Sequence, residues 1–246
     1  IGDPISHSLS PSMHNAAYAA LGLPFIMAAE HVRPAELTEA VRGMRALNIR
    51  GLSVTMPHKV SILPLLDAVD PLAQRVGAIN TVVNESSRLK GFNTDVAGIV
   101  EPLERREPLA GKRVAVLGAG GAAQAAAHGC GSRGASVTIF NRTIEKARAL
   151  ADSCGGSASI LGASPDMSQF NIIINATSLG MGEQAAESPL PESSIEPHHT
   201  IFETIYHPRS TQLVKIAEQR GATVIRGLEM FLEQGLAQFE IHTGVK

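Results

Sequence analysis

The sequence predicts an α/β protein made of two lobes with a cleft between them. Short apolar runs alternate with stretches of helical periodicity along most of the chain, a pattern typical of βαβ units and parallel sheets. The run Val114–Leu117 is apolar at every position, as expected for a parallel strand covered on both faces. Composition shifts after Asp95. We therefore expect a first lobe over residues 1–95, completed by a C-terminal helical segment over residues 229–246, and a second lobe over residues 96–228.

The composition places the chain among globular proteins that act on small molecules. Of the 246 residues, 44% are hydrophobic and 18% are charged, which argues against disorder. The net charge of −2 gives no support for binding nucleic acid or an acidic membrane, and no apolar run reaches the ~18 residues of a membrane span. With two cysteines, Cys130 and Cys154, and no leader pattern, the chain is expected to be cytoplasmic. Ile1-Gly2 is typical of the end of a strand, so the start is expected to be trimmed.

The first lobe is expected to combine short helices with a small sheet. Ser10-Pro11 has the residue types of an N-cap and a first helical position, for a helix that ends near Leu21. Apolar residues at helical spacing from Leu37 to Leu47 indicate a second helix. The other elements expected in this lobe are a strand over 51–55, a helix that begins at Pro57, and a pair of strands over 79–84 and 91–93.

The second lobe shows the alternation more clearly. After a helix over 96–106 and a turn, apolar runs recur with helical stretches between them. Strands are expected at 114–117, 136–140, 172–175, 200–204 and 223–225, and the final helix at about 229–243. This order predicts a parallel sheet with helices packed on its faces.

A glycine-rich turn joins the first strand of the second lobe to its helix. Gly118-Ala119-Gly120-Gly121-Ala122-Ala123 fits the GxGxx(G/A) pattern. The first glycine allows the tight bend, the second lets a phosphate approach the backbone, and the last small residue keeps helix and strand close. The N–H groups at such a helix start attract a pyrophosphate. A purely structural turn is the alternative, but the strand–turn–helix context favours a Rossmann-type dinucleotide site.

The end of the next strand indicates which dinucleotide binds. NAD sites usually carry Asp or Glu there, whereas this strand ends in Asn141-Arg142-Thr143. A carboxylate would repel a 2′-phosphate, while Arg142 with neutral Asn141 and Thr143 accommodates it, and Lys146 adds a second cation one turn later. In the alternative interpretation, Asn141 and Thr143 cap the following helix and Arg142 is merely solvated. NADP is the predicted cofactor.

Polar residues in the first lobe form a second candidate set. Ser8 and Ser10 place two hydroxyls at a helix start, where a simple capping role for Ser10 is an equal alternative. Lys59 lies in the first turn after a strand, where the helix dipole disfavours a cation, so it is either idle on the surface or tuned for proton transfer. Asp95 fits either an N-cap or the partner of Lys59. No metal site is predicted, because the pair His198-His199 lacks further ligands at suitable spacing.

Taken together, these segments resemble the shikimate dehydrogenase family over essentially the whole chain. The motifs that carry the resemblance are Gly2-Asp3-Pro4-Ile5, Ser8-Leu9-Ser10-Pro11, His14-Asn15, Val54-Thr55-Met56-Pro57-His58-Lys59, Ile79-Asn80-Thr81, Gly91-Phe92-Asn93-Thr94-Asp95, the glycine turn, Asn141-Arg142-Thr143, Asn175-Ala176-Thr177-Ser178, Tyr206-His207-Pro208 and Gly227-Leu228-Glu229-Met230-Phe231-Leu232-Glu233-Gln234. So many motifs in this order are not expected by chance.

The resemblance implies that NADPH reduces the carbonyl of 3-dehydroshikimate to the alcohol of shikimate, a step of aromatic amino-acid biosynthesis. It makes Lys59 and Asp95 the catalytic pair, with the lysine supplying a proton to the alkoxide. The residues implied to hold the substrate are Ser8, Ser10, Thr55, Asn80, Tyr206 and Gln234. The residues implied for the cofactor are Gly118, Ala119, Gly120, Gly121, Ala122, Asn141, Arg142, Thr143, Lys146, Thr177 and Gly227. The site would lie in the cleft, at the carboxyl ends of strands.

Two residues depart from the family pattern. Ser53 stands where Asn is common, and His242 stands where Trp is common. Both leave fine substrate preference open, and a quinate/shikimate dehydrogenase with relaxed cofactor choice is the alternative enzyme. A metabolite sensor without turnover is disfavoured because Lys59 and Asp95 are both present. The partners considered are a second copy of the chain or a fused enzyme of the same pathway.

Overall fold

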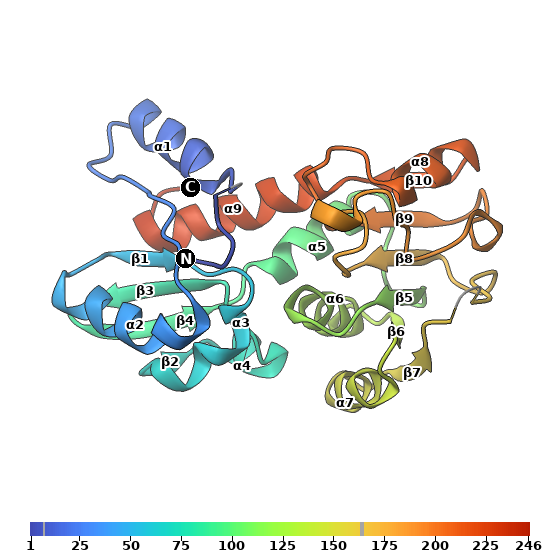
Figure 1. Cartoon of the computed structure of the whole chain (residues 1–246), viewed down its shortest axis with the longest axis horizontal. Helices are drawn as coiled ribbons and strands as arrows, with labels where there is room; N and C mark the ends of the chain where they lie inside the picture. Colours follow the sequence, from blue (N-terminus) through green and yellow to red (C-terminus); the bar gives the residue numbers. More distant parts are fainter. Residues whose placement is uncertain (7, 163–164) are drawn as a thin grey trace. The chain divides into compact units, whose positions relative to one another are not determined.

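The chain forms two compact units of α/β type, and the fold class predicted from the alternating pattern is confirmed. The computed structural model describes residues 1–6, 8–162 and 165–246. Unit 1 comprises residues 1–94 and 235–246, and unit 2 comprises residues 95–234 (Figure 1). The last helix, α9 (Gly227–Thr243), begins in unit 2 and ends in unit 1.

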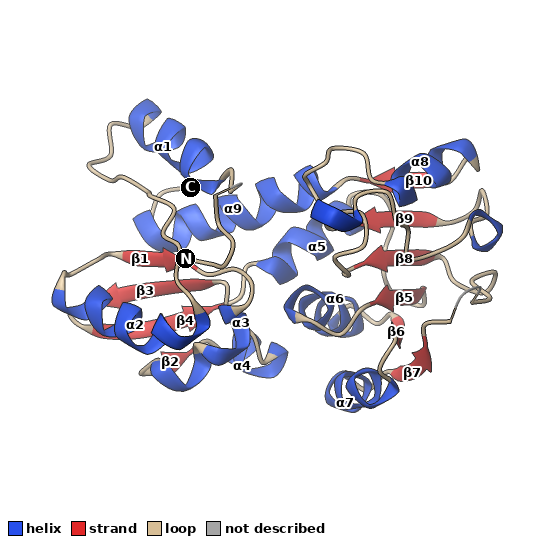
Figure 2. Cartoon of the chain, in the orientation of Figure 1, coloured by secondary structure: helices blue, strands red, loops and turns tan. Residues whose placement is uncertain are grey.

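Unit 1 is built on a four-stranded sheet of order β1-β3-β4-β2 (Figure 2). β3 pairs antiparallel with β1 and β4, while β2 pairs parallel with β4. The strands are β1 (Gly51–Ser53), β2 (Ala68–Val69), β3 (Thr81–Glu85) and β4 (Arg88–Phe92). The helices are α1 (Ser10–Ala20), α2 (Leu37–Ala46), α3 (His58–Ser61), α4 (Pro71–Val76) and two short 3₁₀ helices over Pro34–Glu36 and Leu63–Leu65.

The core of unit 1 forms where α2 covers this sheet. Leu37, Val41 and Met44 repeat at helical spacing and are all buried, because one face of α2 is apolar. They belong to the same cluster of buried side chains as Val82 of β3 and Leu89 of β4. Full burial of each such side chain contributes about 1.5–3 kcal/mol to stability, so this face holds α2 on the sheet.

The C-terminal part of α9 completes unit 1. Gln238 Nε2 donates to the carbonyl of Asn80 at 3.2 Å and to the hydroxyl of Thr81 at 2.9 Å. One turn later, His242 Nε2 lies 3.2 Å from the carbonyl oxygen of Val82. Because the three partners are consecutive in the chain, two successive turns of the helix are held along the start of β3.

Unit 2 contains a six-stranded parallel sheet of order β10-β9-β8-β5-β6-β7 (Figure 2). The strands are β5 (Arg113–Leu117), β6 (Ser136–Asn141), β7 (Ser157–Ile160), β8 (Ile172–Asn175), β9 (Thr200–Glu203) and β10 (Thr223–Ile225). The helices are α5 (Asp95–Glu104), α6 (Gly121–Ser132), α7 (Ile144–Cys154), α8 (Gln212–Gln219) and two short 3₁₀ helices over Gly182–Gln184 and Glu192–Ser194. Strand order reverses between β5 and β8, and ligands of open parallel sheets bind at such a point, outside the carboxyl ends of the strands.

Small residues allow α5 and α6 to pack closely in unit 2. A Cβ added to Gly129 of α6 would lie 2.9 Å from Cγ2 of Val100 and 3.2 Å from Cγ1 of Val96, both on α5. Because protein interiors are close-packed, a larger residue at this position would push the two helices apart. The absence of a side chain at Gly129 therefore lets α6 pack closely against α5.

Several local features differ from those predicted. α1 begins at Ser10 with Leu9 as its N-cap residue and has no side-chain cap bond, so the predicted N-cap role of Ser10 is wrong. The apolar pattern does not predict β7, because Ser157 and Ser159 alternate with small or apolar residues at the edge of the sheet. Gly2 forms a single bridge with His31 in place of the strand end expected at Ile1-Gly2.

Candidate active site

In unit 2, the glycine turn leaves the start of α6 open at the carboxyl end of β5. Gly118 has a φ of +109°, which side chains disfavour, and a Cβ there would lie 2.8 Å from the carbonyl oxygen of Ala176. Gly120 is the N-cap residue of α6, which has no side-chain cap bond from the described residues, and a Cβ on Gly120 would meet no atom within 4 Å. The other residues of the turn are partly exposed: Ala119, Gly121 and Ala122. The first N–H groups of α6 are therefore accessible to an anion.

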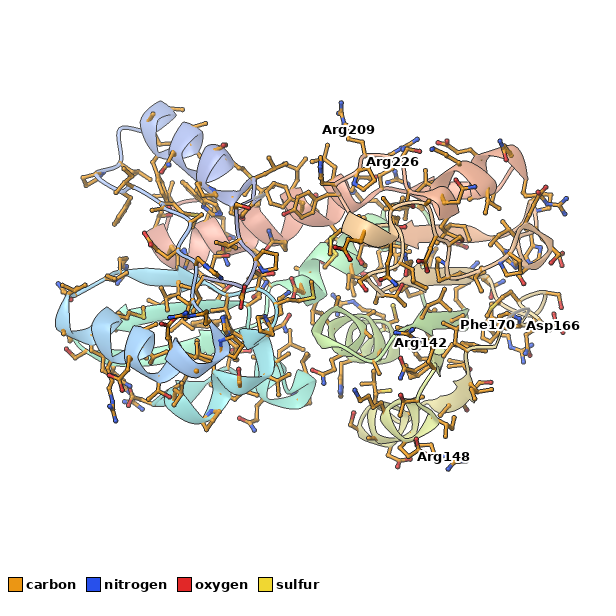
Figure 3. All side chains as sticks on the ribbon, in the orientation of Figure 1. Arg142, Arg148, Asp166, Phe170, Arg209 and Arg226 are labelled. Atoms are coloured by element: carbon orange, nitrogen blue, oxygen red, sulfur yellow. The ribbon has the colours of Figure 1, made fainter. Side chains whose placement is uncertain are left out.

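The end of β6 presents two cations beside small polar residues. Arg142 and Lys146 are exposed, and neither forms an ion pair within the part of the chain that the structure describes. Thr143 is the N-cap residue of α7 but its side chain makes no capping bond, while Asn141 Nδ2 donates to the Thr143 carbonyl at 3.0 Å. Figure 3 shows Arg142 at this end of β6, whereas Arg148 points outward from α7. Two exposed cations, Arg142 and Lys146, beside neutral polar residues have the chemistry needed to bind a 2′-phosphate.

The segment after β8 lies against the glycine turn and is held by Asn175. Asn175 Oδ1 accepts hydrogen bonds from the N–H of Thr177 at 3.0 Å and from its hydroxyl at 2.7 Å. The hydroxyl hydrogen of Thr177 is directed at Asn175, and its oxygen accepts from the N–H of Leu179 at 3.2 Å, so one lone pair is left for a ligand. The neighbouring residue Ala176 brings the segment into contact with Gly118.

A second close approach joins the turn after β9 to the start of α9. A Cβ added to Gly227 would lie 2.3 Å from the carbonyl oxygen of Ile205 and 2.8 Å from the nitrogen of Tyr206, so only glycine fits. The rings of Tyr206 and Phe231 have centroids 5.0 Å apart, and Gln234 Nε2 donates to the carbonyl of Phe231 at 2.9 Å. The structure therefore brings Tyr206, Gly227 and Gln234 together within unit 2.

In unit 1, main-chain hydrogen bonds place Thr55, Lys59 and Asn80 close together. The N–H of Ile79 donates to the carbonyl of Lys59 at 2.7 Å, and the N–H of Val54 donates to the carbonyl of Asn80 at 2.7 Å. Thr55 directly follows Val54, and Asn80 directly follows Ile79. Lys59 lies in α3, which has only four residues, so the helix dipole invoked for it is small.

The carboxamide of Asn80 connects this group to the start of α5. Its Nδ2 donates to the hydroxyl of Thr94 at 2.8 Å, and its Oδ1 accepts from the N–H of Thr94 at 2.8 Å and from the hydroxyl of Thr81 at 2.9 Å. Because Oδ1 faces donors, the orientation of the carboxamide is fixed. Asp95 follows Thr94, is 3% exposed and is the first residue of α5, so it lies inside the helix and not at the N-cap position.

Ser8 and Ser10 lie where the chain enters α1. The N–H of Ser10 donates to Ser8 Oγ at 3.3 Å, and both side chains are partly exposed. A Cβ added to Gly2 would lie 2.5 Å from Cγ2 of Thr55, so the chain that leads to these serines starts beside Thr55.

The predicted site residues divide between the two units. Unit 1 holds Ser8, Ser10, Thr55, Lys59 and Asn80, and unit 2 holds Asp95, Tyr206, Gln234 and the predicted cofactor residues. The cleft expected from the sequence stays a prediction. Among the described residues, no helix is long and apolar enough to cross a membrane, and no three His, Cys, Asp or Glu side chains gather as a metal site.

Comparison with known proteins identifies the family. A family model described as the shikimate dehydrogenase substrate binding domain matches residues 1–82, one described as shikimate / quinate 5-dehydrogenase matches residues 102–184, and one described as the shikimate 5'-dehydrogenase C-terminal domain matches residues 227–246. A curated shikimate dehydrogenase (NADP(+)) from Moorella thermoacetica is 43% identical over 99% of this chain and 86% of its own length. The chain belongs to the shikimate dehydrogenase family.

Solved shikimate dehydrogenases share the fold described above. A shikimate dehydrogenase crystallised in complex with NADP+ is 37% identical, has a TM-score of 0.95, and is matched over 100% of this chain and 88% of that chain. The Thermus thermophilus enzyme in complex with NADP(H) and shikimate is 37% identical, has a TM-score of 0.92, and is matched over 99% of this chain and 92% of that chain. The family resemblance predicted from the motifs is confirmed.

Sequence reasoning missed two buried polar residues that hold these shikimate dehydrogenase segments in place. Gln238 is 0% exposed and Glu203 is 1% exposed, and both donate to or accept from the main chain of neighbouring segments. Burial raises the pKa of the Glu203 carboxyl above its usual value, and its hydrogen bonds offset only part of this rise. The sequence does place a carboxylate at the end of the apolar run in β9. Such an acid, directly after buried residues, needs hydrogen-bond donors around it, and this could have indicated a positioning role for Glu203.

Proposed function

We propose that this chain is an NADP-dependent shikimate dehydrogenase, which reversibly reduces the carbonyl of 3-dehydroshikimate to the alcohol of shikimate in aromatic amino-acid biosynthesis. The observation that carries the proposal is a set of hydrogen bonds around Lys59 and Asn80. The N–H of Ile79 binds the carbonyl of Lys59, and the carboxamide of the next residue, Asn80, binds Thr94, which directly precedes Asp95. One network thus sets the main chain at or beside both members of the proposed catalytic pair. The 43% identity to a curated NADP(+)-dependent relative supports the same reaction.

Unit 2 offers the residues that would hold NADP(H). The uncapped start of α6 suits the pyrophosphate, and the exposed cations Arg142 and Lys146 suit the 2′-phosphate. When bound, the nicotinamide supplies the hydride that reduces the substrate carbonyl. The proposed coenzyme residues are Gly118, Ala119, Gly120, Gly121, Ala122, Asn141, Arg142, Thr143, Lys146, Thr177 and Gly227.

The proposed roles toward the substrate follow from residue chemistry. The Lys59 ammonium donates a proton to the carbonyl oxygen as negative charge develops there. The Asp95 carboxylate is the proposed second member of the catalytic pair and binds the adjacent hydroxyl. Short neutral donors and acceptors bind the carboxylate and the remaining hydroxyls, and these are Ser8, Ser10, Thr55, Asn80, Tyr206 and Gln234. An analogue that lacks a hydroxyl would leave buried polar groups unpaired, which is how such sites discriminate.

A matrix of two coenzymes and two alcohols tests this function. Purified protein is mixed with NADP or NAD and with shikimate or quinate, and absorbance is followed at 340 nm. We expect the highest kcat/KM with NADP and shikimate, because no Asp or Glu ends β6 to bind a ribose 2′-hydroxyl. A preference for NAD and quinate would overturn the proposal, and ligand binding without any absorbance change would identify a sensor.

We propose further that residues 1–95, completed by residues 229–246, form the substrate-binding lobe and that residues 96–228 form the NADP-binding lobe. The polar group around Lys59 and Asn80 in unit 1 and the glycine turn in unit 2 support this division. We also propose that the protein acts in the cytoplasm, as a homodimer or as part of a fused polypeptide. Sedimentation equilibrium of the purified chain gives its mass in solution, and a monomer at all concentrations would exclude the homodimer.

A further inference from the structure

A buried carboxylate at the end of β9 connects the two segments that meet the glycines of unit 2. Glu203 is the last residue of β9 and is 1% exposed. Its Oε1 accepts from Asn175 Nδ2 at 3.0 Å and from the N–H of Ile205 at 3.0 Å. Its Oε2 accepts from Asn175 Nδ2 at 3.1 Å and from the hydroxyl of Thr211 at 2.7 Å. Both oxygens are therefore satisfied by donors from three different residues.

The donors around Glu203 stabilise an ionised carboxylate. Asn175 Nδ2 and the N–H of Ile205 carry hydrogens and no lone pair to accept one, so a proton on either carboxyl oxygen would meet a donor. The hydroxyl of Thr211 accepts from the N–H of Val214 at 3.3 Å, which directs its own hydrogen to Glu203. Burial without these bonds would be costly, whereas hydrogen bonds to a charged acceptor are among the stronger ones in proteins.

The first segment that Glu203 holds is the loop after β8. By binding Asn175 Nδ2, the carboxylate fixes the flip of that carboxamide, and Asn175 Oδ1 then faces Thr177. The hydroxyl of Thr177 accepts in turn from the N–H of Leu179 at 3.2 Å. This chain of bonds sets the path of Asn175–Leu179, the loop whose Ala176 carbonyl contacts Gly118.

The second segment is the turn after β9. The bond from Ile205 N–H to Glu203 holds the main chain at the point where Gly227 approaches it most closely, since a Cβ on Gly227 would lie 2.3 Å from the Ile205 carbonyl oxygen. Tyr206 follows directly. A change at Glu203 therefore moves main chain at both glycines together, although the side chain itself is buried beneath them.

We propose that Glu203 is a positioning residue for the coenzyme site: its carboxylate holds the loops Asn175–Thr177 and Ile205–Tyr206 in the shape that receives the dinucleotide. The inference rests on the proposed function in that it takes the coenzyme to be NADP(H). The 2′-phosphate group is bound separately, by Arg142 at the end of β6. A disturbance at Glu203 therefore weakens coenzyme binding and leaves the preference for NADP over NAD unchanged.

Glu203→Gln is the decisive variant, and Glu107→Gln is its matched control. Glutamine replaces one acceptor oxygen with an NH₂ that faces donors, so Glu203 loses one or two charge-assisted bonds. Glu107 accepts from the hydroxyl of Thr200, the first residue of β9, and forms an ion pair with Lys112. The control thus makes the same chemical change in a glutamate that contacts the opposite end of β9.

The readouts are the Kd for NADPH by fluorescence titration, far-UV circular dichroism and the ratio of Kd values for NADP and NAD. For Glu203→Gln we expect Kd to rise about 10- to 100-fold, with a folded spectrum and an unchanged coenzyme ratio. For Glu107→Gln we expect a change of less than about 3-fold, the effect of a partly exposed ion pair. Unchanged Kd in Glu203→Gln, or an equal rise in the control, would overturn the proposal.

Glu203→Asp keeps the proposal testable if the glutamine variant does not fold. Aspartate retains the charge but withdraws the oxygens by about one bond length, so its Kd for NADPH should rise above that of the wild type by less than about 10-fold. An aspartate variant that binds NADPH as well as the wild type, or with a Kd raised about 100-fold, would contradict the role of a placed carboxylate. Wild-type protein that binds NADPH but does not oxidise shikimate in the presence of NADP+ would refute the proposed function and leave this test intact.

Discussion

Two buried neutral histidines make unit 1 sensitive to acid. His14 of α1 is 1% exposed, and neither of its ring nitrogens has a hydrogen-bond partner among the described residues. Its ring packs on aromatic neighbours, with centroids 5.9 Å from Tyr18 and 6.0 Å from Phe239. Burial lowers the pKa of His14 to about 4, and burial lowers the pKa of His242 to about 4 as well. Both rings are therefore neutral in the folded protein at pH 7.

The size and the sign of the effect follow from proton linkage. An unfolded histidine has a pKa near 6.5, so below that pH the unfolded chain binds protons that the folded state excludes. Stability is fully present above pH 6.5 and falls as the pH drops toward 4. At pH 5, 1.5 pH units below the unfolded value, each histidine removes about 2 kcal/mol of unfolding free energy, using ~1.4 kcal/mol per unit. Domains have about 5–15 kcal/mol in total, so the loss is large.

The contribution of His14 to this pH dependence can be measured by urea unfolding, followed by circular dichroism. Wild type and His14→Phe are compared at pH 7.5 and pH 5.0. Phenylalanine keeps an aromatic ring against Phe239 and removes no hydrogen bond that the structure shows. We expect the difference in unfolding free energy between the two pH values to be about 2 kcal/mol smaller in His14→Phe than in the wild type. An equal pH dependence in wild type and His14→Phe would refute the reasoning.

Three further predictions concern the proposed catalytic and coenzyme residues. Lys59→Ala should lower kcat by about 10²- to 10⁴-fold, the usual contribution of a positioned acid, with little change in shikimate Kd by calorimetry; Lys215→Ala, at an exposed position of α8, is the control, and unchanged turnover would remove Lys59 from its role. Arg142→Ala should raise the Kd for NADP at least about 10-fold more than that for NAD, because a charged phosphate contact is lost; calorimetry measures both, and equal weakening would mean that the side chain does not bind the 2′-phosphate. Gly118→Ala should destabilise unit 2 by about 1–3 kcal/mol, because the residue has a φ of +109° and its Cβ would meet the Ala176 carbonyl at 2.8 Å; a melting temperature equal to the wild type would contradict this strain.

The sequence predicted the strands of unit 2 well because most of them are buried on both faces. The runs at β5, β8 and β9 are found within a residue of their expected bounds. β7 escapes prediction because its Ser157–Ile160 residues are half polar at the sheet edge, where pairing with β6 and not apolar burial defines the strand. The start of α1 was misplaced by one residue, because Ser10 has a capping residue type but donates its N–H to Ser8.

Site residues were found by motif, whereas the residues that hold them were not. Local patterns carry the glycine turn, because the bend, the phosphate approach and the helix start occupy six consecutive positions. Glu203 has no such pattern: its partner Asn175 lies 28 positions away in the chain, and their contact depends on the pairing of β8 with β9. Gln238 reaches Thr81 across 157 positions. Only the folded topology makes these neighbours visible.

The path of α9 restricts how this polypeptide can be dissected. A fragment that stops at residue 94 lacks the two turns that bind the start of β3, so the carbonyl groups of Asn80 and Val82 lose a donor from the same helix. Splitting the gene at the apparent boundary would therefore leave the first piece without residues 235–246 of its own unit. A stable isolated module requires grafting residues 235–246 back, either as a separately added peptide or through a new linker in a rearranged open reading frame.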